Sequence, residues 1–321
     1  MKVSVLVPVY NGEPFLTECL ESILAQDFAD MEILIADDAS TDGSVALIQR
    51  YATKDQRIRC WQNQNNLGPV GNFNLLLKKA GGKYIKYVLA DDKLATPDAL
   101  NRMTEVLDND ESVSLVASAT QIIDSGSQLL RVRNYFRKSG LWDGKRTIVQ
   151  CLEERGNVIG EPSVVMFRKE QAARGFSHRL RVLADWEMWF HLLEQGRFGY
   201  IQEPLCAFRI HPNQDSALCS RAGLPQVEHV VVLEDYFAKP WLRTATSRRA
   251  LFAQIYNLRK WQGRQDSPLT TDLLKMLRVR WYVLYWLRHK STRPFTHLIH
   301  WLKRQFESAR AFIRRMATVN L

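Results

Sequence analysis

Two pairs of adjacent aspartates, each at the end of an apolar run, are the residues of this chain best placed to do chemistry. The run 31–36 leads into Asp37–Asp38, and the run 84–90 leads into Asp91–Asp92. In an open parallel sheet, the ligand crevice lies at the carboxyl ends of the strands. Adjacent carboxylates repel each other unless a cation or hydrogen-bond donors lie between them. A divalent metal that carries a diphosphate would relieve this repulsion, although an aspartate pair can also simply begin a turn.

Apolar runs and helical repeats alternate along the first ninety residues. Residues 2–9 predict a buried strand, and residues 15–26 place apolar side chains at helical spacing. Further strands are predicted at 31–36, 58–62 and 84–90, with helical segments between them. This strict alternation of strand and helix predicts a parallel α/β sheet.

Seven short motifs in this chain resemble, in order and spacing, those of family 2 inverting glycosyltransferases. The motifs are Pro8–Gly12, Asp37–Asp42, Asn66–Gly68, Ala90–Asp92, Gly160–Ser163, Ala184–Trp189 and Arg209–Pro212. Any one of them is weak, but seven in order are specific, and they cover roughly residues 1–215. The resemblance implies a glycosyltransferase-A-type fold, in which a mostly parallel sheet is flanked by helices. We expect residues 1–220 to form this nucleotide-sugar-binding catalytic domain.

The resemblance also implies a nucleotide-sugar pocket at the ends of the first strands. Asp38 would face the base of the donor, which we expect to be UDP-linked, and Tyr10 could stack on that base. Asn72 would lie near the donor, or it could cap its own helix. The other expected members of this pocket are Pro8, Val9, Asp37 and Asp91.

Inverting transfer is a single displacement at the anomeric carbon. It needs a base for the acceptor hydroxyl and stabilisation of the departing diphosphate. The resemblance implies Asp185 as the base and Asp92 as a ligand of manganese or magnesium. Asp185 could instead cap the helix 186–195. His211 is a second candidate metal ligand, although a lone histidine is more often a structural residue.

Glu161 and Trp186 are the residues that we expect on the acceptor side. Trp186 opens an aromatic run through Phe190 that could exclude water and hold the face of a sugar. Relatives often have Glu-Asp where this chain has Ala184–Asp185. The base is therefore kept, while an accessory carboxylate is missing.

The net charge of +10 is distributed unevenly along the chain. Residues 241–321 hold 17 Lys and Arg against 3 Asp and Glu, a net charge of +14. Residues 1–240 hold 27 against 31, a net charge of −4. Such asymmetry suggests an anionic partner for the C-terminal part.

The C-terminal extension, residues 221–321, is expected to be mainly helical. The candidate helices are 227–237, 247–262, 270–288 and 296–317. The last of these gathers Trp301, Phe306 and Phe312 on one apolar face and its arginines outside that face. This pattern is typical of a helix that binds an anionic membrane surface, but it also fits a helix that docks on the catalytic domain. We do not expect a nucleic-acid partner, because a carboxylate-lined site would repel a phosphate chain.

Cysteine usage and hydropathy predict a cytoplasmic protein. Together with the basic C-terminal helix, they predict a peripheral position on the inner face of the cytoplasmic membrane. The five cysteines show no paired spacing, which fits reduced thiols. The first strand begins at residue 2, which leaves no room for a signal peptide. No apolar stretch reaches the length of about 18 residues that a spanning helix needs.

The expected function is transfer of a sugar from a nucleotide donor to a lipid-linked or polysaccharide acceptor in cell-surface glycan synthesis. A nucleotidyltransferase is one alternative, but it usually shows basic residues near the N-terminus. Here Lys2 and Arg50 are the two basic residues among the first fifty. A catalytically inactive relative that serves as an assembly subunit is another alternative, against which the retention of Asp38, Asp92 and Asp185 argues.

Overall fold

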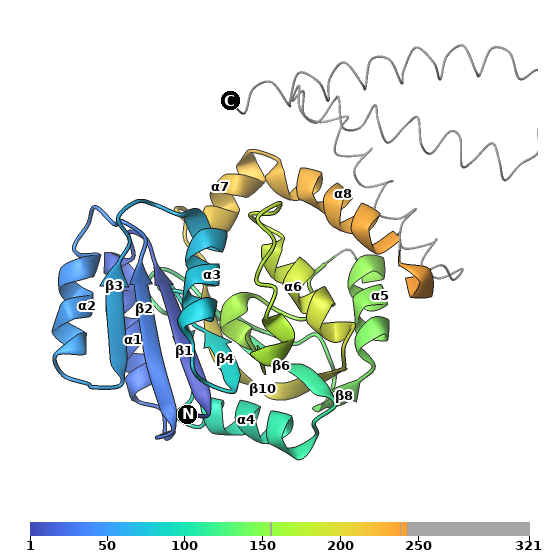
Figure 1. Cartoon of the computed structure of the whole chain (residues 1–321), viewed down its shortest axis with the longest axis horizontal. Helices are drawn as coiled ribbons and strands as arrows, with labels where there is room; N and C mark the ends of the chain where they lie inside the picture. The colour runs from blue at the N-terminus through green and yellow to red at the C-terminus, as the bar shows by residue number, and fades with distance from the viewer. Residues whose placement is uncertain (155, 238, 243–321) are drawn as a thin grey trace, which may run out of the picture. The chain divides into compact units, whose positions relative to one another are not determined.

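The computed structural model describes residues 1–154, 156–237 and 239–242 (Figure 1). The predicted helix 227–237 corresponds to α8, Leu224–Phe237. The other three predicted helices, and with them the proposed membrane-surface helix, lie outside the described residues.

The first part of the chain forms a parallel block in the order β3-β2-β1-β4. The two central strands are buried along almost their whole length, as expected for parallel strands covered on both faces. Helices connect successive strands, and Figure 1 shows α1 and α2 beside β1, β2 and β3. The elements are β1 (Val3–Val9), α1 (Glu13–Leu24), β2 (Met31–Asp37), α2 (Ser44–Ala52), β3 (Ile58–Gln62), α3 (Gly68–Lys79) and β4 (Tyr84–Tyr87).

The second part continues the same sheet in the order β4-β9-β6-β10-β5. The long strand β6 pairs in parallel with β10, whereas β9 is antiparallel to both of its neighbours. Two short strands lie off this path: β7 pairs with β6, and β8 pairs with β10. The strands are β5 (Lys93–Leu94), β6 (Val113–Ile123), β7 (Leu129–Arg133), β8 (Gly140–Trp142), β9 (Val165–Arg168) and β10 (Arg197–Arg209).

The α/β architecture is as expected, but the sheet is mixed rather than mostly parallel. The first four strands form the predicted parallel block. Beyond β4, antiparallel strands enter because their connections are not simple strand-helix-strand crossovers. The helices of this part are α4 (Ala99–Asn109), α5 (Gly144–Glu154), α6 (Ala184–Leu193), α7 (Asp215–Arg221) and α8, with 3-10 turns at Pro162–Val164, Glu170–Ala172 and Pro240–Leu242.

Helix α8 packs on α6, as Figure 1 also shows. Tyr236 of α8 meets Phe190 of α6 edge to face, with 5.1 Å between ring centroids. Tyr236 and Leu242 belong to the same buried core as the sheet. A domain boundary at residue 220 would therefore cut through this packing.

None of the helices in the described part of the chain combines the length and the apolar character that a membrane-spanning helix requires.

Candidate active site

The loops that follow β1 and β2 lock into each other at the carboxyl end of the sheet. The Asn11 N–H donates to Ser40 Oγ, and the Thr41 N–H donates to Asn11 Oδ1, both at 2.9 Å. Asn11 and Ala39 have φ values of 49° and 61°. This left-handed backbone is tolerable in asparagine but unusual in alanine, so the interlocked loops must hold it.

Asp38 lies at the centre of these loops and is 2% exposed. Its Oδ1 accepts hydrogen bonds from Asn63 Nδ2 and from the Leu67 N–H, both at 2.8 Å. Asp38 therefore fixes the loop that leads from β3 into α3. Both of these bonds use Oδ1, and neither uses Oδ2.

Asn72, which was expected near the donor, is buried and contacts the Asp38 loops through Asn63. It is 2% exposed; its Nδ2 donates to the Ala36 carbonyl, and its Oδ1 accepts from Asn63 Nδ2. It does not cap α3, whose N-cap residue is Leu67. Asn72 thus orients Asn63, which in turn binds Asp38. Sequence reasoning missed Asn63, because a single asparagine after a strand carries no distinctive spacing.

The other predicted pocket residues occupy the ends of β1 and β2. Tyr10 is 55% exposed, as an aromatic ring that is free to stack on a base would be. Val9 is buried and Pro8 is half-buried, so they form the floor of these loops. Asp37 is buried as well, and its Oδ1 accepts the Ser40 N–H at 3.0 Å. Asp37 therefore shapes the turn that presents Asp38.

The second aspartate pair divides into one exposed and one enclosed side chain. Asp91 is partly exposed, and its Oδ2 lies 3.1 Å from His211 Nε2. The His211 ring also packs on Phe15 of α1, with 4.8 Å between centroids. The chain thus brings Asp91 and His211 together over 120 residues of sequence.

Asp92 points into the interior and is 1% exposed. Its Oδ1 accepts the Arg209 N–H at 2.9 Å. Burial raises the pKa of Asp92 well above its usual range, and the charge of Asp91 adds to this, while contacts with Ser163 and Arg209 oppose it. Its Oδ2 is buried and has no hydrogen-bond partner. Asp92 stays a predicted metal ligand, and the more exposed Asp91 is a second candidate beside it.

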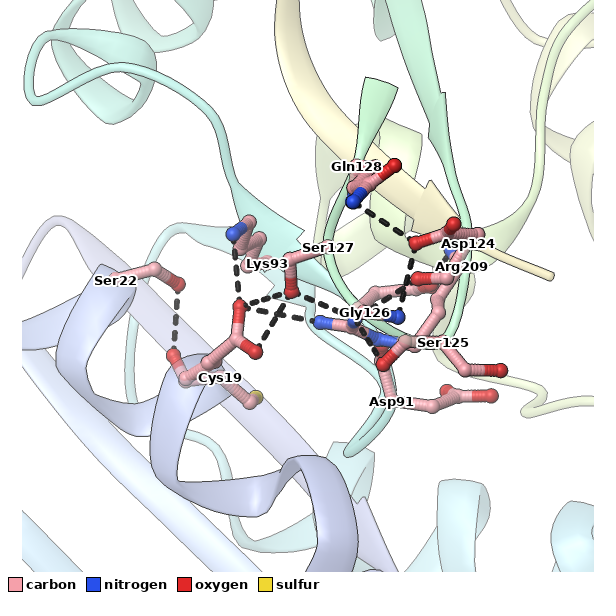
Figure 2. A network of polar contacts seen from close by, with 12 residues as sticks. Cys19, Ser22, Asp91, Lys93, Asp124, Ser125, Gly126, Ser127, Gln128 and Arg209 are labelled. Atoms are coloured by element: carbon pink, nitrogen blue, oxygen red, sulfur yellow. Dashed lines mark hydrogen bonds and ion pairs between the residues drawn. The ribbon is translucent and has the colours of Figure 1, made fainter. Parts of the chain in front are cut away.

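Arg209 connects the Asp91–Asp92 turn to the rest of the site (Figure 2). Its side chain is fully buried, and Nε donates to the Asp91 carbonyl at 2.8 Å. Nη1 donates to Ser127 Oγ at 2.8 Å and to the Asp124 carbonyl at 3.1 Å, both in the turn between β6 and β7. Nη2 lies 3.3 Å from Glu18 Oε2 of α1, and Glu18 in turn binds Lys93 and Ser127. Arg209 therefore joins three segments that are distant in sequence.

Asp91 and His211 fit a divalent cation that also binds substrate phosphates. Their carboxylate and imidazole groups are suitable donors, and both face the carboxyl end of the sheet beside the Asp38 loops. Among the described residues, no cluster of three or more His, Cys, Asp or Glu could hold a metal ion without help. A cation here would need the diphosphate as a further ligand, as magnesium-type sites commonly do.

Asp185 lies in the first turn of α6 and is partly buried. Burial raises its pKa to about 7; the Trp186 N–H, which donates to Oδ1 at 2.8 Å, opposes the shift, and the charges of Glu161 and Glu228 add to it. A carboxyl group with a pKa near neutrality is well matched to proton abstraction. The N-cap position belongs to Leu183, so Asp185 does not occupy the predicted cap.

Glu228 of α8 supports the segment that enters α6. Its Oε2 accepts the N–H groups of Val182 and Leu183 at 2.9 and 2.8 Å, and its Oε1 accepts the Arg181 N–H at 2.8 Å. Glu228 thereby satisfies backbone donors at the start of α6 that no side chain of the helix itself could reach. Sequence reasoning missed this residue, because its partners lie more than forty positions away.

Glu161, expected on the acceptor side, lies between the two aspartate sites. It forms an ion pair with Arg133 of β7. Its charge contributes to the raised pKa of Asp92 and also to that of Asp185. Glu161 is therefore within electrostatic reach of both carboxyl groups, and its acceptor-side role stays a prediction.

Trp186 and the aromatic run after it belong to the core instead of lining the acceptor site. Trp186 is 5% exposed and meets His229 of α8 edge to face at 5.0 Å. Trp189 is fully buried, and its indole N–H donates to the Gly160 carbonyl. These buried rings offer no open face to a sugar. The periodicity of α6 could not show this, since the covering helix α8 comes much later in the chain.

Comparison with known proteins agrees with this geometry. Residues 4–175 match the family described as Glycosyl transferase family 2. The putative glycosyltransferase EpsE of Bacillus subtilis is 29% identical over 75% of this chain and 88% of its own length. The putative teichuronic acid biosynthesis glycosyltransferase TuaG of the same species is 27% identical over 67% of this chain and 81% of its own length.

Solved structures share the fold. TarS of S. aureus, in complex with UDP-GlcNAc, superposes with a TM-score of 0.57 at 21% identity, covering 68% of this chain and 61% of that chain. The mannosyltransferase PcManGT of Pyrobaculum calidifontis, in complex with GDP-Man and Mn2+, superposes with a TM-score of 0.57 at 18% identity, covering 98% of this chain and 87% of that chain. These matches confirm the expected glycosyltransferase-A-type fold.

Proposed function

This chain belongs to glycosyl transferase family 2, and we propose that it moves a sugar, with inversion, from a nucleotide-sugar donor to a lipid-linked or glycan acceptor. The observation that carries the proposal is the pairing of a partly exposed Asp91–His211 contact with Asp185, whose pKa is about 7. The Asp91–His211 contact suits a metal-bound diphosphate, and Asp185 suits removal of a hydroxyl proton.

In the proposed mechanism, the donor base lies against Tyr10 and the loop that Asp38 holds. Asn63 and Asn72 keep Asp38 in place. His211 and one of the two aspartates, Asp91 or Asp92, would hold a divalent cation, manganese or magnesium, which when bound supplies positive charge against the departing diphosphate. UDP-GlcNAc in TarS and GDP-Man in PcManGT indicate that both nucleotide classes should be tested.

Asp185 acts on the acceptor. Its carboxylate takes the proton of the acceptor hydroxyl as that oxygen bonds to the anomeric carbon. The bond from this carbon to the diphosphate breaks at the same time, and the electron pair leaves with the diphosphate. Aromatic rings of α6 pack on α8 and are buried there, so they do not contact the acceptor.

The proposed acceptor is a lipid-linked or glycan molecule of the cell surface. TuaG is named for teichuronic acid biosynthesis, which supports a role in cell-surface polysaccharide synthesis. A place on the inner face of the cytoplasmic membrane, as first expected from the C-terminal charge, would give access to a lipid-linked acceptor.

The proposal is tested with purified full-length protein and a panel of UDP- and GDP-sugars, with and without Mn2+. We expect one donor to raise the melting temperature in the presence of metal and to release its nucleoside diphosphate. Release of the sugar 1-phosphate, with the nucleoside monophosphate passed to an acceptor, would instead indicate nucleotidyl transfer. Absence of any turnover would indicate an inactive assembly subunit.

Asp185→Asn tests the base. We expect donor binding to persist and turnover to fall by roughly 10²-fold or more, the usual worth of a positioned base. Asp98→Asn is the matched control, since Asp98 is exposed and its side chain makes no capping bond at the start of α4. Normal turnover by Asp185→Asn would place the base elsewhere.

A further inference from the structure

Strand β7 exposes three large apolar side chains within four residues. Leu129, Leu130 and Val132 are 57%, 55% and 43% exposed. We call these three residues the β7 strip. Contiguous apolar exposure on a soluble domain marks an interaction surface more often than isolated exposure does, and the proposed donor and base sites do not use these residues.

The surroundings of the β7 strip are basic. Residues 125–142 contain four basic residues and no aspartate or glutamate. Arg131, Arg137 and Lys138 are exposed. Arg133 is paired with Glu161, and the other three basic side chains are exposed. A surface that combines apolar side chains with exposed positive charge is complementary to an anionic lipid surface.

The β7 strip is held firmly at both ends. At its start, Ser127 accepts a hydrogen bond from buried Arg209 (Figure 2). The Ser127 hydroxyl also donates to Glu18. At its end, Arg133 binds Glu161. Beyond it, Phe136 packs on Trp142 and Tyr200, with centroid distances of 4.6 and 5.0 Å. The strip is therefore a fixed part of the domain rather than a loose loop tip.

One edge of β7 has no strand beside it among the described residues, since β7 pairs with β6 alone there. A second copy of this chain could in principle add a strand at that edge. Two β7 strands brought together would, however, oppose arginines to arginines, and like charges on neighbouring strands are unfavourable. The charge therefore favours lipid over self-association.

We propose that the β7 strip binds the surface of an anionic lipid bilayer, with Leu129, Leu130 and Val132 entering the interface and the nearby basic side chains contacting lipid phosphates. The ion pair of Arg133 with Glu161 places this contact next to the acceptor side of the site. The benefit for catalysis rests on the proposed function, but binding to lipid does not.

The test follows residue 130 directly, so that membrane binding by another part of the chain cannot imitate the result. Leu130→Cys is made in full-length protein in which the half-buried Cys60 is replaced by serine, and it is labelled with the environment-sensitive dye NBD. Glu111→Cys, labelled in the same way, is the control, because Glu111 is exposed and lies at the opposite end of β6 from the turn into β7. Vesicles of phosphatidylglycerol or phosphatidylcholine are then added.

We expect anionic vesicles to shift the emission at residue 130 to the blue and increase its intensity, and added salt to reduce the effect. Residue 111 should not respond. No change at residue 130, an equal change at residue 111, or an equal response to neutral vesicles would overturn the proposal. A change that depends on protein concentration without vesicles would overturn it in favour of self-association.

Donor hydrolysis separates this proposal from the proposed function. Leu129→Ser combined with Leu130→Ser should weaken the response to anionic vesicles of a label at residue 132, introduced as Val132→Cys. The same pair of changes should leave metal-dependent nucleotide release in solution unaltered. Lipid binding without any turnover would support the β7 strip while contradicting the proposed activity.

Discussion

The site has a donor half, formed by the loops around Asp38, and a catalytic half, formed by the Asp91–Asp92 turn with Arg209, His211 and Asp185. The donor half forms from neighbouring strand-helix units, and its loops bond to each other over short spans, as Asp38 does to Asn63. The catalytic half depends on distant segments: Arg209 binds Asp92 across 117 residues, and Ser127 binds Glu18 across 109. Short local motifs can therefore predict a nucleotide pocket. The base and the metal ligands are positioned by contacts between distant segments, which no short motif contains.

The largest expected difference concerns stability. Arg209→Leu removes a buried guanidinium and leaves the carbonyls of Asp91 and Asp124 without their donor. Breaking such a network typically costs 3–5 kcal/mol, and we expect about 3 kcal/mol here, because Glu18 is partly exposed to solvent. Asn63→Ala in the donor half should cost about 1.5 kcal/mol, the lower end of the range for a hydrogen bond to a charged group such as the Asp38 carboxylate.

Urea unfolding of both variants measures this difference, and Arg209→Lys should recover part of the loss. Equal losses of stability in Arg209→Leu and Asn63→Ala would remove the distinction between a locally built donor half and a distantly linked catalytic half.

The predicted strands, the parallel block and the aspartate pairs at strand ends could all be read from the sequence, because alternation and strand-end position are local properties. The allocation of roles within the second pair could not. Asp91 and Asp92 are the same residue type at adjacent positions. Asp92 is buried against Arg209, whereas Asp91 is partly exposed beside His211, and both partners come from a distant part of the chain. The acceptor-side position of Trp186 could not be judged from the sequence for a related reason, since α8, which covers Trp186, lies outside the recognised motifs.

The second prediction separates the two neighbouring aspartates. If Asp91 is the ligand, Asp91→Asn should lower turnover by roughly 10²-fold or more and abolish the metal dependence of nucleotide binding, because charge stabilisation by a bound cation is worth several kcal/mol. Asp92→Asn should then keep that metal dependence, since an asparagine oxygen can still accept the Arg209 N–H. Calorimetric titration of the nucleoside diphosphate with and without Mn2+ measures both variants. The reverse pattern would identify Asp92 as the ligand.

The third prediction uses the pKa of Asp185. A base must be ionised to act, so turnover should rise with pH up to about 7 and then level off, falling about tenfold per unit well below that value. A pH profile of nucleotide release under saturating donor measures this limb. Glu228→Gln removes a negative charge that raises the pKa of Asp185, so the limb should move to lower pH. A purely structural role of Glu228 would reduce activity without moving the limb.

The smallest expected effects are those of substituting two asparagines of helix α3. Asn72 points to the donor half, where it orients Asn63 and through it Asp38. Asn74, two positions later, exchanges hydrogen bonds with the backbone of Phe176, 102 residues away. Asn72→Ala should weaken nucleotide binding by about fivefold, which corresponds to one lost neutral hydrogen bond of about 1 kcal/mol. Asn74→Ala should leave nucleotide affinity unchanged and lower the free energy of unfolding by a similar amount. Titration with the nucleoside diphosphate, together with urea unfolding of each variant, would show both effects. If both variants lost affinity equally, the donor half would depend on distant contacts as well, because α3 would then transmit the position of the 176–178 segment to Asp38.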